Sequence, residues 1–446
     1  MRKLFTVGIA LKIISLIFFF FIDVAISSSG NSNMQQVLRS EQIQPIAYDI
    51  NNDFSDLKDF QPLEAGISSL IQKFDMKGAS IAVTKDGKLI YAKGIGYADI
   101  EANEVVEPRH MFRIASISKL ITATTIMKMT EMGILDLDDR VFGSSGILND
   151  SVYLDYADRR VENITVRHLL NHTAGWNRRF GDHMFMPHLI SREMKAELPV
   201  QVPDIIRFAL KKNLHFNPGS RTSYSNLGYA ILGEIIEETT GMRYEDYVRQ
   251  TILYPLGIRD MRIGGNLEDE RYENEVKYYE QYNAISVNSV YDISEIVPKS
   301  YGGNDIHTLG AAGGWIASPA EILKLVTAID GKSGVPDILS PESLEIMTNT
   351  RLSGGHTLGW TGTDGRGNWW RTGTFAGTSA IVMRQNNGLN WAVFFNSSTY
   401  RGSGLSRDIN REVLTALNKI ENWPDHDLFF HINNLPFLYP DLAELR

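Results

Sequence analysis

Strand patterns near both ends of the chain, separated by a long helical stretch, most constrain how this sequence can fold. Near the start, residues 79–84 and 88–93 are β-prone and are joined by an Asp-Gly turn, the strongest short-range hairpin signal. Near the end, residues 368–373, 379–383 and 389–396 have the pattern of neighbouring antiparallel strands. We therefore expect an α/β fold of the α+β type, with an antiparallel β-sheet flanked by helices and a mostly helical second region.

Apolar periodicity and residues typical of helix ends predict the helices. We expect them at 62–74, from about 116 to a stop at Gly133, at 164–176, at 227–239, from Pro319 onward and at 407–417. The glycine-rich segment 310–315 is expected to lead into the helix at Pro319, and 262–300 to be an irregular surface excursion.

These elements divide the chain into segments. The main domain is predicted at 61–417, its α/β part at about 61–145 and 300–417 and its helical part at about 146–299. Residues 28–60 are polar and lack a sustained period, which predicts a flexible leader, and 418–446 form a C-terminal extension.

Composition excludes several classes of protein. The 446-residue chain is 43% hydrophobic and 22% charged, which is typical of a soluble globular protein with an ample core. The net charge of −9 and the lack of a basic run argue against a nucleic-acid partner. The absence of cysteine excludes disulfides, thiolate metal sites and a cysteine nucleophile.

The N-terminus has the pattern of a secretory signal. Residues 1–3 include two basic side chains, 4–22 are apolar apart from Lys12 and Ser15, and 25–27 are suited to signal peptidase. We predict that 1–27 are removed and that the protein is secreted or periplasmic, with no stable membrane span after cleavage. An uncleaved N-terminal anchor is the alternative.

Ser116 and Lys119 form a Ser-x-x-Lys motif where a helix is expected to begin. Residues three apart share a helix face, so the lysine amine lies over the serine hydroxyl and can take its proton if its pKa falls. Taken alone the motif is weak, because most such pairs are ordinary helix starts, and Ser55 with Lys58 also matches it. We assign that second copy no function.

His168 and His172 lie together within the predicted helix at 164–176. No carboxylate stands at metal-ligand spacing from them, so we interpret them as surface or satisfied core histidines. We predict no metal and no cofactor.

Three polar clusters on separate elements carry a family resemblance. They are Ser116 with Lys119, Tyr224 with Asn226, and Arg371 followed by Thr372 and Gly373. Their order and flanking sequence resemble the serine β-lactamase and penicillin-binding family, in particular its class C β-lactamase, DD-peptidase and carboxylesterase branch. The resemblance covers roughly 61–417 and implies a β-lactamase/transpeptidase-like fold. Two decoys, 272–274 and 332–334, fit the later motifs but lack the right neighbours.

The resemblance implies roles for these residues. Ser116 is the acyl-accepting nucleophile, while Lys119 and Tyr224 share the removal of its proton and the delivery of one to the leaving group. Asn226 orients the lysine and donates to a substrate amide, and the backbone N–H groups of Ser116 and Thr374 form the oxyanion hole. A tyrosine must lower its pKa by about 3 units to act as a base at pH 7.

Arg371 departs from the family pattern, in which lysine or histidine opens the third motif before Thr372 and Gly373. Arginine cannot release a proton, so it can tune the field beside the tyrosine or anchor a substrate with a free carboxylate. A simpler alternative is that an acidic neighbour pairs with it.

The sequence therefore predicts a serine hydrolase that forms an acyl-enzyme with a small-molecule or peptide substrate. A D-amino-acid peptidase or carboxypeptidase and an esterase are favoured equally, and a β-lactamase comes third, because the arginine departs from the pattern. The rival from another class is a non-catalytic binding or scaffold protein that retains the fold.

Overall fold

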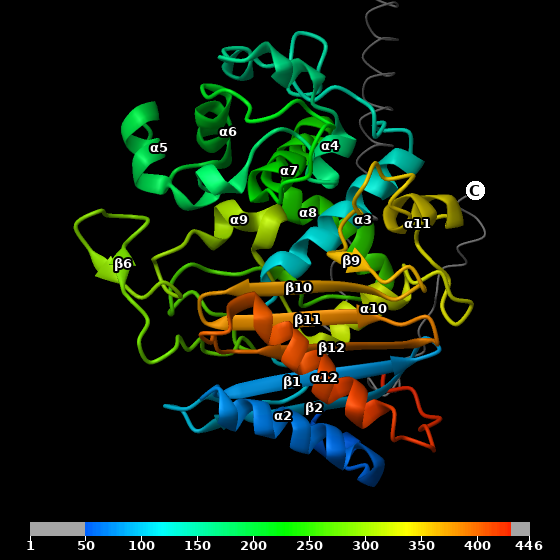
Figure 1. Cartoon of the computed structure of the whole chain (residues 1–446). Coiled ribbons are helices and arrows are strands. Elements are labelled where there is room, and N and C mark those ends of the chain that lie inside the picture. The colour runs from blue at the N-terminus through cyan, green and yellow to red at the C-terminus, as the bar shows by residue number, and fades with distance from the viewer. Residues whose placement is uncertain (1–49, 430–446) are drawn as a thin grey trace, which may run out of the picture. The chain divides into compact units, whose positions relative to one another are not determined.

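A seven-stranded antiparallel sheet is the centre of the protein, and the computed structural model describes residues 50–429 of the chain (Figure 1). The strand order is β3-β2-β1-β12-β11-β10-β9, so strands from the two ends of the sequence meet between β1 and β12. The strands are β1 Gly78–Lys85, β2 Lys88–Asp99, β3 Glu104–Val105, β9 Gly362–Thr363, β10 Trp369–Phe375, β11 Thr378–Arg384 and β12 Leu389–Phe395.

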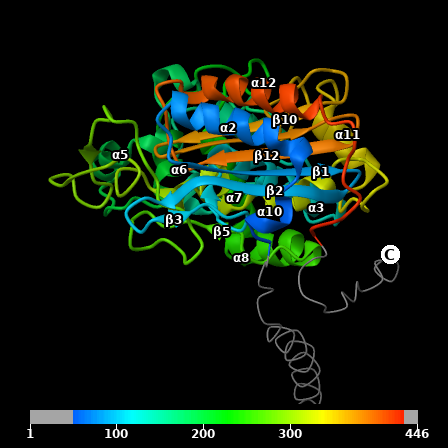
Figure 2. The ribbon, with the colours of Figure 1, turned by 90° about the horizontal axis from the view of Figure 1, so that it is seen from below.

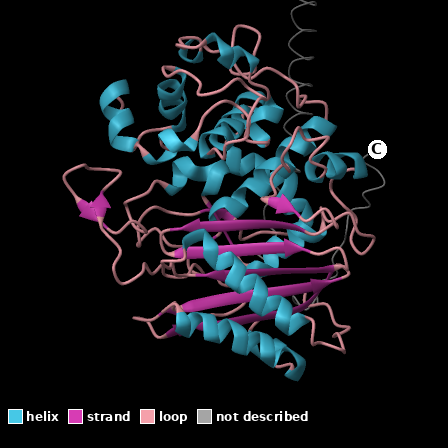
Figure 3. Cartoon of the chain, in the orientation of Figure 1, coloured by secondary structure: helices cyan, strands magenta, loops and turns pink. Residues whose placement is uncertain are grey.

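Both faces of this sheet are covered by helices (Figure 3). The helices α2 (Gln61–Lys73) and α12 (Leu405–Leu417) lie side by side over one face, as Figure 2 shows. The helix α10 (Pro319–Thr327) covers the other face. Alternate side chains of β12 enter the two cores, with Val393 on the α2 side and Phe394 on the α10 side. A strand buried on both faces is mostly apolar, and in β12 every residue is buried and all but Asn390 are apolar.

A helical region lies beyond the β10 side of the sheet (Figure 1). Its helices are α3 Ser118–Glu131, α4 Val166–Leu170, α5 Pro187–Met194, α6 Val202–Leu210, α7 Asn226–Thr240, α8 Tyr244–Val248, α9 Ile306–Gly313 and α11 Pro341–Thr348. The ends of α7 follow from its sequence, because the Ser225 side chain accepts from the Gly228 N–H at the start and Gly241 has a φ of 67° at the end. The predicted mixed fold, an antiparallel sheet flanked by helices, is confirmed.

The helices α8, α9 and α11 were not predicted. The predicted glycine-rich approach at 310–315 begins inside α9 (306–313), and a short strand β8 (Trp315–Ala317) separates α9 from α10. Glycine disfavours helices, but Asp305 caps α9, which packs between α3 and α7. Tertiary packing therefore overrides the local propensity here.

The described part of the predicted leader, residues 50–60, forms two short 3-10 helices, η2 (Asn52–Ser55) and η3 (Lys58–Phe60). The Phe60 ring stacks on Tyr91 of β2, with centroids 4.3 Å apart. The rest of that leader, the predicted signal at 1–27 and residues 430–446 lie outside the described residues. Within 50–429, we find no helix with the length and apolar character needed to cross a membrane.

The close approach of β10 to the turn before α3 needs a glycine. A Cβ atom added at Gly373 would lie 2.1 Å from the Ile114 carbonyl oxygen, so any side chain there pushes the strand away from that turn.

We expect Gly373→Ala to lower the free energy of unfolding by about 1–3 kcal/mol, the usual effect of overpacking. Gly66→Ala is the matched control, because Gly66 lies inside α2 and its added Cβ would make only ordinary contact, 3.4 Å from Glu412. Alanine there is expected to be neutral or to stabilise by up to about 1 kcal/mol. Urea unfolding of both variants checks this, and equal effects would contradict it.

Candidate active site

Ser116 lies on a sharp turn at the start of α3, in the short helix η4 (Ala115–Ile117). Its neighbour Ala115 has a φ of +47°, a conformation that side chains other than glycine rarely adopt. The turn is held from below by Ser118, whose hydroxyl donates to the Ala115 carbonyl at 2.7 Å and accepts from the Trp315 N–H at 3.2 Å. The serine hydroxyl is thereby presented to a cavity.

Lys119 is completely buried beneath this serine. Its Nζ donates to Ser116 Oγ at 3.3 Å, to Asn226 Oδ1 at 2.7 Å and to the Ala312 carbonyl of α9. Burial and the nearby charge of Arg371 lower the pKa of Lys119 to about 8, although Tyr224 acts in the opposite direction. The amine can thus both hold and release a proton near neutral pH.

Tyr224 comes from the segment before α7 and meets the serine directly. Its hydroxyl lies 2.7 Å from Ser116 Oγ, and Lys119 Nζ stands 5.0 Å from the centre of its ring. Burial disfavours the ionised phenol, but the charges of Lys119 and Arg371 outweigh it and lower the pKa of Tyr224 to about 8. Serine, amine and phenol form one hydrogen-bonded group.

Arg371 of β10 is directed into this group. Its Nε donates to the Ser116 carbonyl oxygen at 2.7 Å and its Nη2 to the Tyr224 hydroxyl at 3.2 Å, while only 1% of the residue is exposed. Within residues 50–429 it forms no ion pair, so the alternative of an acidic partner is wrong for the part of the chain that the structure describes. Two of its donor groups serve the site itself.

His172 supports the tyrosine and is a residue whose importance the sequence did not reveal. Its ring packs 4.6 Å from the Tyr224 ring, and its Nδ1 accepts from the Ser225 N–H at 3.3 Å. Burial, Arg371 and Lys119 hold the pKa of His172 well below its usual range, so it is neutral. Its prediction as a core histidine agrees with this position.

A cavity of about 320 Å³ opens above the nucleophilic turn. Most of the residues singled out from the sequence line it, namely Ser116, Tyr224, Asn226, Arg371, Thr372 and Thr374. Lys119 lies beneath Ser116, and Gly373 allows β10 to approach the turn before α3. Arg178, Phe185 and Phe375 also line it and were not predicted. Arg178 and Phe185 lie in a charged loop without periodicity, which offered no signal.

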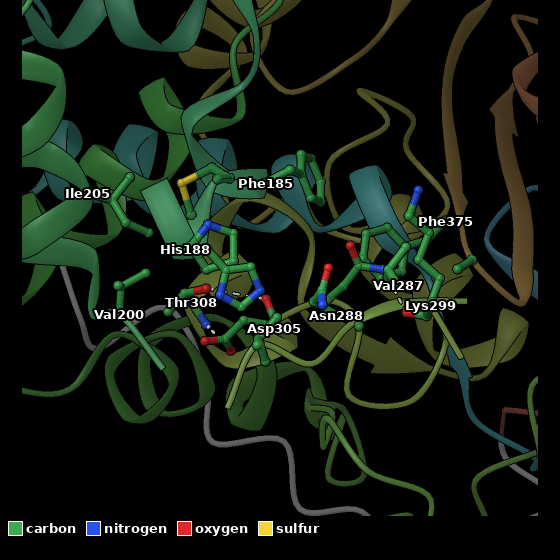
Figure 4. Close-up of a pocket in the computed structure, with 16 residues that line it drawn as sticks. Phe185, His188, Val200, Ile205, Val287, Asn288, Lys299, Asp305, Thr308 and Phe375 are labelled. Carbon is green, nitrogen blue, oxygen red and sulfur yellow. Dashed lines mark hydrogen bonds between the residues drawn. The ribbon is translucent and has the colours of Figure 1, made fainter. Parts of the chain in front are cut away.

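A second, more apolar pocket of about 530 Å³ adjoins this cavity (Figure 4). The two share Phe185 and Phe375, whose ring centroids lie 6.1 Å apart. Its apolar lining comes from three regions far apart in sequence and includes Met184, Val200, Ile205, Val287 and Val290. A substrate bound at Ser116 has room for an apolar group beyond the two phenylalanines.

The decoy motifs have structural roles. Ser55 is buried, and its hydroxyl accepts from the Ala92 N–H at 3.2 Å. Ser55 does not line the cavity. Lys332 lies on the surface, where its Nζ donates to the Asn386 carbonyl at 2.8 Å.

Comparison with known proteins agrees with this geometry. The family described as Beta-lactamase matches residues 64–415. Penicillin-binding protein 4* of Bacillus subtilis (strain 168) is 30% identical over 217 residues, which cover 48% of this chain and 44% of the relative. The match thus spans less than half the length of that curated relative.

Solved structures show the same fold. The octameric penicillin-binding protein homologue from Pyrococcus abyssi has a TM-score of 0.61 and 27% identity, covering 81% of this chain and 78% of that one. The D-amino acid amidase from Ochrobactrum anthropi SV3, in its complex with L-phenylalanine amide, has a TM-score of 0.63 and 21% identity, covering 81% and 99%. At that identity the likeness shows the fold alone.

The fold and the family match place the chain in the class of proteins with the β-lactamase fold. More particularly, the chain belongs to the β-lactamase family, because that family matches most of its length.

The position of Arg371 predicts a pH effect. Its charge lowers the pKa of both Lys119 and Tyr224, so Arg371→Met should raise both and move the acid limb of the hydrolysis rate to higher pH. We expect the rate at pH 7 to fall by about tenfold or more. Arg371→Lys keeps the charge and should shift the limb less.

The measurement is the pH dependence of p-nitrophenyl ester hydrolysis for the three proteins, with melting temperatures to verify folding. An acid limb that stays in place in Arg371→Met would contradict the electrostatic role.

Proposed function

We propose that this protein is an exported serine hydrolase that forms an acyl-enzyme on Ser116 and cleaves an amide, peptide or ester. The observation that carries the proposal is the position of Ser116 Oγ, which lies 2.7 Å from the Tyr224 hydroxyl and 3.3 Å from Lys119 Nζ. A serine needs a nearby base to become a nucleophile, and here two candidates touch it. The signal pattern at 1–27 supports export.

Acylation follows from this arrangement. Ser116 Oγ attacks the substrate carbonyl carbon while its proton passes to the Tyr224 oxygen or Lys119 Nζ, and the carbonyl oxygen takes up the negative charge. Ser116 and Thr374 both line the cavity, and in this proposal their backbone N–H groups donate to that oxygen. The leaving group then takes the proton, and water releases the acyl group by the reverse route.

The phenol is suited to this role because two cations adjoin it. With a pKa of about 8, its ionised form at pH 7 lies only about 1.4 kcal/mol above the neutral form. An unperturbed tyrosine would require about three times as much. Arg371 and Lys119 therefore supply most of the shift that a tyrosine base needs.

We propose that the substrate is a D-amino-acid peptide or amide, or an ester, with an apolar group. The apolar pocket beyond Phe185 and Phe375 supports such a group. For a substrate with a free carboxylate, Arg178 lines the cavity and is exposed, and Arg371 Nη1 remains to donate. A D-Ala-D-Ala peptide, a p-nitrophenyl ester and a chromogenic cephalosporin, assayed side by side, would rank the candidates.

The rival function is a non-catalytic binding protein that retains the fold. The buried ammonium of Lys119, held against Ser116 at the expense of desolvation, argues against it. A site without chemistry has no physical need for that arrangement.

We expect a fluorophosphonate to add one label to wild-type protein, at Ser116, and none to Ser116→Ala. The labelling rate should rise with pH around 8, as the pair of bases loses its proton. Peptide mass spectrometry locates the label. Ser55, in the same Ser-x-x-Lys pattern, is the internal control and should stay unmodified. Unlabelled Ser116 would favour the non-catalytic rival.

Filling the apolar pocket should change selectivity. Asn288 lies exposed at its rim, and Asn288→Trp should reduce kcat/KM for a phenylacetyl ester about tenfold more than for an acetyl ester. Ile293→Trp is the matched control, since it is exposed in the same segment but outside the pocket lining. Equal losses for both esters would show that the acyl group does not enter this pocket.

A further inference from the structure

Both the oxygen and the nitrogen of the Asn226 side-chain amide are hydrogen-bonded. Its Oδ1 accepts from Lys119 Nζ at 2.7 Å, and its Nδ2 donates to Asp182 Oδ2 at 2.7 Å. A carboxylate can only accept and an ammonium can only donate, so these two neighbours admit one orientation of the amide. With the amide reversed, an NH₂ group would face the ammonium and a carbonyl oxygen would face the carboxylate.

Asp182 lies in the loop between two 3-10 helices, η7 (Arg178–Phe180) and η8 (His183–Phe185). Its other oxygen, Oδ1, accepts from the Met184 N–H at 3.2 Å and so caps η8. Arg178 of η7 and Phe185 of η8, on either side of Asp182 in the sequence, line the cavity. One carboxylate therefore joins the cavity wall to the amide that holds the lysine.

We propose that Asp182 is a positioning residue for the serine hydrolase reaction, which acts through Asn226 to hold Lys119 against Ser116. Asp182 does not touch the nucleophile and does not itself line the cavity, so its effect reaches the reaction only through the Asn226 amide and through its charge. This inference rests on the proposed function of Ser116 as the acyl acceptor.

The charge of Asp182 acts in the same group. Lys119 faces Tyr224, Tyr229 and Arg371. Neutral His172 lies behind them, and His183 adjoins the carboxylate. Burial and Arg371 lower the pKa of Lys119, whereas Asp182 raises it. Removing the carboxylate should therefore lower that pKa further and move the acid limb of the rate to lower pH, opposite to the shift expected for Arg371→Met.

Two substitutions separate geometry from charge. Asp182→Asn keeps one acceptor oxygen, which can serve Asn226 at the loss of the bond from the Met184 N–H, and it removes the charge. Its acid limb should therefore move to lower pH while the plateau rate changes little. Asp182→Ala also frees the amide, and its plateau rate should fall by about tenfold or more. Glu193→Gln is the control for charge, because Glu193 pairs with Lys212 on the surface and should leave both features unchanged.

A double-mutant cycle tests the route through Asn226. If the route is correct, Asp182→Ala should alter the plateau fluorophosphonate labelling rate of Asn226→Ala protein by less than about twofold, because on the plateau the charge effect on the pKa of Lys119 no longer limits the rate. A full tenfold loss in that background, or an acid limb unmoved in Asp182→Asn, would overturn the inference while leaving the proposed function intact. Wild-type protein that is not labelled at Ser116 would overturn both.

Discussion

The burial of one ammonium group, that of Lys119, is the constraint on which the site depends. A buried charge is tolerated only where hydrogen-bond acceptors replace water, and three acceptors from separate elements do so: Ser116 Oγ, Asn226 Oδ1 and the Ala312 carbonyl. The turn before α3, the start of α7 and the end of α9 must therefore meet at one point. The same burial makes the amine a usable base, because it lowers the lysine pKa to about 8.

The electrostatics of the site follow from placing two cations beside one phenol. Lys119 and Arg371 both favour the ionised form of Tyr224, and the phenol in turn favours the protonated lysine. The serine hydroxyl thus faces two groups that exchange protons near the same pH. Asp182, which bonds to Asn226, raises the pKa of Lys119, whereas Arg371 lowers it. The balance between an outer carboxylate and an inner guanidinium sets how readily the lysine gives up its proton.

The sheet provides the rigid side of this arrangement. Helices cover both of its faces, and β10 pairs with β11 along its whole length while its Arg371 reaches the nucleophilic turn. The close contact between Gly373 and Ile114 brings the strand near enough for the guanidinium to bridge the serine carbonyl and the tyrosine. The opposite wall comes from loops, of which the one at 177–186 carries Phe185. One side of the cavity is thus held by a rigid sheet and the opposite wall by loops, which can vary without disturbing the sheet. This arrangement suits a fold that serves many substrates.

The sequence by itself determined the five long strands of the sheet and the helices α2, α3, α4, α7, α10 and α12, because their period, turns and end residues are local signals. It also determined which residues form the three motifs, since these follow the order of a known family. Only the tertiary structure decided that Arg371 points at Ser116 across 255 positions, that glycine-rich residues 306–313 are helical, and that His172 and Asp182 belong to the site. The physical reason is that each of these depends on contacts between segments far apart in the chain, for which no local pattern exists.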